Sequence, residues 1–81
     1  MTFICTIVLR NAVRATSKVV PVLVAAQDAK TASDRAGHLA LRTVWEQPGW
    51  AVHSSKISLT EFNAEQIRAL LGSVIVEAPC L

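Results

Sequence analysis

The chain has 81 residues, of which 52% are hydrophobic and 17% are charged, and its eight basic and six acidic residues give a net charge of +2. This length allows a single domain, residues 1–81, and the basic residues form no dense run of the kind that marks a strong nucleic-acid footprint. The longest apolar stretch, residues 19–26, is too short for a bilayer-spanning helix, which needs about 20 residues.

The first quarter of the chain predicts two β-strands. Residues 2–10 are rich in β-branched side chains and apolar at both alternating sets of positions, so we expect a strand with both faces substantially buried. Residues 11–17 form a polar connection that is longer than a tight hairpin turn, and residues 18–26 predict the second strand. Pro21 lacks an amide hydrogen, which favours an edge position or a bulge.

Residues 28–47 predict a helix of about nineteen residues with two different apolar faces. Leu41 and Trp45 fall on one side, beside His38 and Asp34. The opposite stripe is made of small side chains and can therefore lie close against a sheet; its members are Ala29, Ala32, Ala36, Leu39, Ala40, Thr43 and Val44.

Local signals set the ends of this helix and lead into the third strand. Asp28 is the expected N-cap, because its carboxylate can accept from a free backbone amide of the first turn. Pro48 cannot continue the helix, and Gly49 completes the exit. Residues 50–60 predict the third strand, with a bend at Ser54 and Ser55.

A second helix follows with a clear capping signature. Asn63 is the expected N-cap and Gln66 stands at the third helical position, which together predict a capping box. Phe62 and Ile67 occupy the two positions of a hydrophobic staple, and Gly72 is the expected residue just past the helix end.

The element order is therefore β-β-α-β-α-β, an α+β fold with the alanine-faced helix packed on one face of a small antiparallel or mixed sheet. The handedness of the crossover returns strand three parallel to strand two, with strand one antiparallel between them, in the order 2-1-3. The last strand, residues 73–77 before Pro79, either extends an edge or pairs with a second copy.

Few residues have the spacing that chemistry requires. His38 and His53 have no cysteine or carboxylate at metal-ligand spacing, and the three glycines form no phosphate-binding loop, so we expect no metal, no cofactor and no enzymatic activity. Cys5 and Cys80 are either two free thiols or a single bridge that ties the tail to the first strand.

Two groups of basic residues are candidates for contacts with a partner. Arg10, Arg14 and Lys18 cluster around the first turn, where they are either merely solvated or an electrostatic contact for a phosphate backbone. Arg35 and Arg42, seven residues apart, lie on one flank of the first helix.

Trp45 is the strongest candidate for a contact outside this chain's own core, because a domain this small cannot cover both sides of one helix. We predict a partner-binding site at Trp45, Leu41 and His38, flanked by Arg42 and Arg35. The alternative is that Trp45 folds back over the turn at residues 48–50. Trp50 itself is expected in the core.

The segment from Val22 to Asp28, the alanines at 32, 36 and 40, Trp45, and residues 49–52 together resemble small phage-encoded proteins. Some anti-CRISPR proteins of this size have a comparable hairpin, alanine-faced helix and returning strand. The likeness covers residues 3–60 and rests on architecture and spacing, so no functional residue is carried over. It implies an inhibitor that occupies a surface of a bacterial host protein or protein complex.

These observations give a leading hypothesis and two alternatives. The leading hypothesis is a cytoplasmic protein-binding inhibitor that acts stoichiometrically. Charged residues are scarce against the roughly 25% typical of soluble domains, which favours apolar surface covered by a partner or by a second copy in a homodimer. The first alternative is a homodimeric nucleic-acid-binding accessory protein that uses the basic first turn, and the other is a small-ligand or enzyme site in a dimer cleft.

Overall fold

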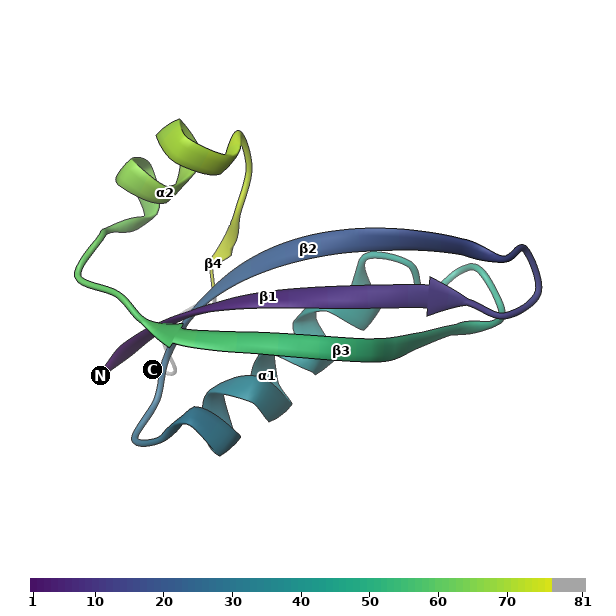
Figure 1. The fold of residues 1–81 in the computed structure, drawn as a ribbon, viewed down its shortest axis with the longest axis horizontal. Helices are drawn as coiled ribbons and strands as arrows, with labels where there is room; N and C mark the ends of the chain where they lie inside the picture. The colour runs from purple at the N-terminus through teal and green to yellow at the C-terminus, as the bar shows by residue number, and fades with distance from the viewer. Residues whose placement is uncertain (77–81) are drawn as a thin grey trace.

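The computed structural model describes residues 1–76, and within them it has two helices and one sheet (Figure 1). The elements are, in chain order, β1 (Thr2–Asn11), β2 (Thr16–Ala25), α1 (Ala29–Arg42), β3 (Trp50–Leu59), α2 (Ala64–Leu71) and β4 (Ile75–Val76). This arrangement confirms the expected α+β class and the expected order of elements.

The strands lie side by side in the order β3-β1-β2-β4 over the described part of the chain. β1 is antiparallel to both β2 and β3, which confirms the expected central position of the first strand. β4 pairs in parallel with β2, through Val22 with Ile75 and Leu23 with Val76, so the last strand extends an edge within the chain. Because β4 pairs only with Val22 and Leu23, Pro21 and the earlier residues of β2 form an open edge of the sheet. This position agrees with the edge location that the missing amide hydrogen of Pro21 favours.

α1 packs on one face of the sheet through its small side chains. Ala32, Ala36 and Ala40 are completely buried, and they share one core cluster with alternate residues of β1 from Phe3 to Leu9. A methyl side chain holds the helix only a short distance from the sheet. The alanine stripe is thus confirmed, although Ala29 and Thr43 at its ends are exposed.

The opposite face of the sheet, here called the far face, is less covered than the face that packs against α1. Residues that pair directly across two strands have their side chains on the same face of the sheet. The far face is therefore made of the even-numbered residues of β1 and of the residues in β2 and β3 that pair with them. Its central part includes the following residues, all of them half-buried or exposed: Thr6, Val8, Arg10, Ser17, Val19, Pro21, Ala51, Ser54, Lys56 and Ser58. Within β1 itself the residues of this face from Thr2 to Val8 are half-buried, so the predicted burial of both faces of the first strand holds except at Arg10, which is exposed.

α2 lies near the end of the sheet where the chain begins, away from α1 (Figure 1). Asn63 and Gln66 form the expected capping box, at 2.9 Å in both directions between each side chain and the other residue's backbone amide. Gly72 ends the helix with a φ of +82°, a conformation that side-chain-bearing residues rarely adopt. Ile67 is buried whereas Phe62 is 48% exposed.

α1 is shorter than its sequence pattern suggested. Asp28 caps it as expected, accepting from the backbone amide of Thr31 at 2.8 Å, but the helix ends at Arg42 and not near residue 47. The hydroxyl of Thr43 donates to the carbonyl of Ala40 at 2.7 Å, and the Thr43 amide donates to the same carbonyl at 3.1 Å. These bonds tighten the last turn, and the chain continues as turns until β3 begins.

The connection between β1 and β2 is only residues 12–15, shorter than the predicted polar connection over residues 11–17, and it depends on a buried polar side chain at the end of β1. Asn11 is 0% exposed. Its Oδ1 accepts from the amides of Val13 and Arg14 at 2.9 and 3.0 Å, and its Nδ2 donates to the carbonyl of Pro48 at 3.1 Å. Asn11 therefore joins the β1–β2 hairpin to the segment that enters β3.

No helix within residues 1–76 is long and apolar enough to cross a membrane. Cys5 is a free cysteine packed in the core, whereas Cys80, Pro79 and the end of the predicted last strand at Glu77 lie outside the described residues.

Candidate functional site

A shallow groove runs between α1 and β3, and it contains two of the residues predicted to bind a partner. This α1–β3 groove has a volume of about 260 Å³ and is lined by Ser33, Asp34, Gly37, His38, Leu41 and Val52. Leu41 is half-buried against the core and His38 is exposed. Gly37 widens the groove because it has no side chain: a Cβ built there would lie 3.5 Å from Cγ2 of Val52.

Two hydroxyls bridge α1 and β3 beside this groove. Oγ of Ser33 and Oγ of Ser55 are 3.1 Å apart. Close by, the pairing of β1 with β3 is irregular: Leu9 pairs with Val52 and Val8 with Ser54. His53 is the extra residue between them, so the irregularity lies one residue before the predicted bend.

Trp45 lies outside α1, in the turns that follow it, because the helix ends early. It is 76% exposed, so it does not fold back over the turn at residues 48–50. Trp50 is half-buried against the core, and its Nε1 donates to Oε1 of Gln47 at 2.9 Å. The two indoles thus have different roles: Trp50 closes the end of the sheet and Trp45 is presented to solvent.

The two arginines predicted to flank this site lie apart from the groove lining. Arg35 donates from Nη1 to the carbonyl of Ala25 at 3.1 Å and lines a separate hollow with Met1 and Gln27. Arg42 is exposed in the last turn of α1, three residues before Trp45. Of the predicted set, the structure brings His38 and Leu41 into one groove, leaves Arg42 and Trp45 exposed beyond it, and ties Arg35 to the end of β2.

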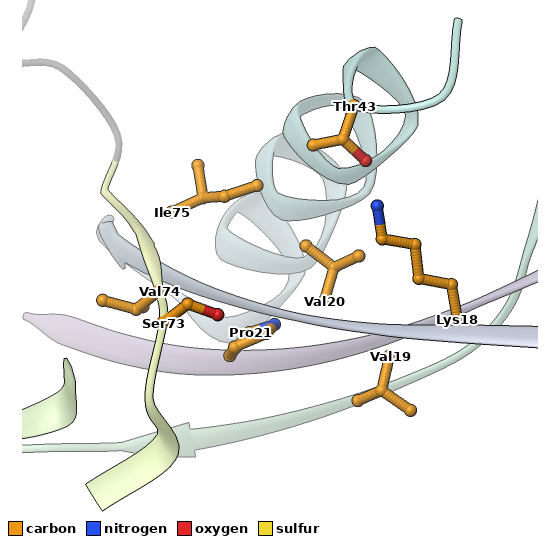
Figure 2. A pocket seen from close by; sticks show the side chains of 8 residues that line it. All are labelled: Lys18, Val19, Val20, Pro21, Thr43, Ser73, Val74 and Ile75. Carbon is orange, nitrogen blue, oxygen red and sulfur yellow. The ribbon is translucent and has the colours of Figure 1, made fainter. Parts of the chain in front are cut away.

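The three basic residues of the first turn do not share a face. Arg10 lies on the far face and Arg14 in the loop that follows. Lys18 pairs with Leu9, a core residue, and therefore lies on the same side of the sheet as α1. Figure 2 shows Lys18 and Val20 on one side of β2, with Val19 on the other.

Lys18 instead borders a hollow of about 220 Å³ at the open edge of β2 (Figure 2). Thr43, at the end of α1, and residues 73–75 form the other walls of this hollow. The side chain of Lys18 extends along it, with its amine toward Thr43 (Figure 2). The hollow is shallow and lined largely by Val20, Pro21 and Ile75. The polar side chains that a ligand there would meet are those of Lys18, Thr43 and Ser73; the Thr43 hydroxyl donates its hydrogen to the carbonyl of Ala40.

The described residues hold no cluster of three or more His, Cys, Asp or Glu side chains that could bind a metal ion.

Burial raises the pKa of the Cys5 thiol, and its Sγ lies 3.8 Å from the carbonyl oxygen of Ala32. A buried thiol with a raised pKa is a poor nucleophile, because the thiolate is the reactive form. Cys5 therefore acts as a small core residue.

Sequence reasoning missed Asn11 and Lys56. Asn11 continues the odd-numbered buried positions of β1, and this parity was the available signal. Lys56 lies on the same face as Arg10 because β3 pairs with β1, and no local sequence pattern indicates this pairing.

Comparisons of the chain with known protein families, with curated proteins and with solved structures find no match.

Proposed function

We propose that this protein is a small protein-binding module that acts stoichiometrically by occupying a surface of a partner protein, with no catalysis of its own. The observation that carries the proposal is the exposure of Trp45, which at 76% is the most exposed large hydrophobic residue among those the structure describes. Buried tryptophans supply a disproportionate share of binding energy in protein interfaces.

The magnitude is sufficient for a central contact. A tryptophan side chain buries roughly 150–250 Å², so burying the exposed three quarters of Trp45 removes on the order of 150 Å² from water. At about 25 cal/mol per Å² this contributes about 4 kcal/mol. The α1–β3 groove, which Trp45 does not line, offers the partner a second contact, since Leu41 and Val52 leave apolar surface accessible there.

The partner that fits this surface has an apolar pocket for the indole and an acidic rim facing Arg42. The likeness to phage-encoded inhibitors makes a bacterial host protein or protein complex the partner class, and the bacterial cytoplasm the place of action. A homodimer of this chain is part of the same proposal, because a second copy would cover further apolar surface.

The test begins with the tagged full chain, used to recover a partner from nuclease-treated bacterial lysate. Affinities of that purified partner are then measured for the wild type, for Trp45→Ala and for Leu70→Ala. Leu70 is a matched control because it is 67% exposed but lies on α2. We expect Trp45→Ala to weaken binding by at least about 30-fold, the equivalent of about 2 kcal/mol, and Leu70→Ala to change it less than twofold. Equal affinities for all three proteins would contradict the proposal.

A further inference from the structure

The charged strand residues of the far face are both basic in the part of the chain that the structure describes. Arg10 lies on it from β1, and Lys56 lies on it from β3, where it pairs with Thr6. Both basic side chains belong to exposed residues, and Arg14 stands in the exposed loop that continues from Arg10.

The acidic residues within residues 1–76 all lie outside the three long strands. None occurs in β1, β2 or β3, and those within the described residues are in the helices, at their caps or in connections: Asp28, Asp34, Glu46, Glu61 and Glu65. The fold therefore separates charges that the sequence distributes evenly. Although the net charge of the chain is only +2, the strands within residues 1–76 contain three basic residues, Arg10, Lys18 and Lys56, and no carboxylate.

Hydroxyl-bearing and apolar side chains surround these cations, with Val8 between them along β1 and Val19 beside it on β2. Thr6, Ser17, Ser54 and Ser58 lie on the far face beside Arg10 and Lys56. Lys56 pairs with Thr6, which is four residues from Arg10 along β1. At about 3.4 Å per residue and one strand spacing of about 4.8 Å, the Cα atoms of Arg10 and Lys56 are on the order of 14 Å apart. Arginine, lysine, serine and threonine side chains are the groups that contact phosphate oxygens in nucleic-acid complexes.

We propose that the far face binds the phosphate backbone of double-stranded nucleic acid without reading its sequence. The charge of the face complements a phosphate chain, and its hydroxyls supply further donors. No aromatic side chain stands on the far face in the described residues, so the stacking platform that single strands need is missing there. This surface is separate from Trp45, which follows the helix packed on the opposite face.

The three cations Arg10, Arg14 and Lys56 set the expected salt dependence. Each phosphate neutralised contributes about −0.9 to the slope of log K against log salt for duplex DNA. Three contacts predict a slope of about −2.7, so raising the salt concentration from about 50 to about 200 mM weakens binding about 40-fold.

The test measures binding of the full chain to labelled DNA and RNA duplexes of arbitrary sequence across this salt range, with polyglutamate as an anionic polypeptide. Arg10→Gln combined with Lys56→Gln removes two charges from the far face. Lys18→Gln combined with Lys30→Gln removes the same charge from residues that lie off this face, on the α1 side of β2 and on α1 itself. Both variants change exposed residues, and a thermal unfolding curve checks that each is folded.

We expect the first variant to weaken duplex binding at least tenfold and to reduce the size of the slope by about 1.8, and the second to change affinity less than twofold. Binding of both duplexes indicates that the shared phosphate chemistry is recognised, and a preference for one of them identifies the natural source. Equal weakening by the two variants, no duplex binding at low salt, or polyglutamate bound as tightly as duplex would each overturn the proposal.

Discussion

Replacing Gly37 with alanine should stabilise the protein while filling part of the α1–β3 groove. Gly37 lies inside α1, and a Cβ there would meet Cγ2 of Val52 at 3.5 Å, an ordinary van der Waals contact. Glycine costs about 0.8–1.0 kcal/mol relative to alanine in a helix interior. We therefore expect the free energy of unfolding to rise by about 1 kcal/mol, which for a domain of this size raises Tm by about 4–8 °C.

Chemical and thermal unfolding curves measure this change, and Gly72→Ala is the matched control. Gly72 has open space around it but a φ of +82°, so the same methyl group strains the backbone there and should lower the free energy of unfolding. The groove is the further readout: a partner that inserts a side chain beside Leu41 should bind Gly37→Ala more weakly although this variant is the more stable protein. A clear loss of stability in Gly37→Ala, or the same sign of change at both glycines, would refute the reasoning.

Further predictions concern the residues that hold the hairpin end and the core. Asn11→Ala removes three hydrogen bonds of the buried amide and should lower the unfolding free energy by about 3 kcal/mol, at about 1 kcal/mol each. Gly49→Ala should also destabilise, because its Cβ would lie 2.8 Å from Oδ1 of Asn11 at a φ of +94°; urea unfolding measures both. The amide of Thr31 holds the pKa of Asp28 below its ordinary value, so its stabilising contribution is present at neutral pH and is lost as the pH falls through that lowered pKa. Unfolding curves across acidic pH should thus depend less on pH for Asp28→Asn than for the wild type. In a Cys80→Ser background, Cys5 should react with a thiol reagent only after unfolding, because it is fully buried and burial raises its pKa.

Local signals predicted much of this fold. Asp28, Asn63 and Gly72 act at helix ends, where a side chain or a backbone conformation meets a requirement set by its immediate neighbours. The alanine spacing identified the packed face of α1 because helical periodicity is also a local property. Handedness of the crossover then placed β1 at the centre of the sheet.

Features that depend on distant residues were not predictable in this way. The early end of α1 arises from the competition of the Thr43 hydroxyl for a helix carbonyl, which placed Trp45 outside the helix. Asn11 is buried because its amide reaches Pro48, 37 residues away in the chain. For the same reason the sequence did not show that Arg10 and Lys56 share a face or that Lys18 does not, since strand register decides both.

The central claim, that Trp45 enters a partner protein, is tested most directly by fluorine NMR. Incorporating 5-fluorotryptophan into this chain alone gives one signal from each of its two tryptophans, and Trp50→Phe assigns them. On addition of the unlabelled partner, the account predicts that the Trp45 signal moves and loses its sensitivity to exchange of H₂O for D₂O, while the Trp50 signal stays in place. A Trp45 signal that remains unchanged and solvent-sensitive at saturating partner would contradict the account.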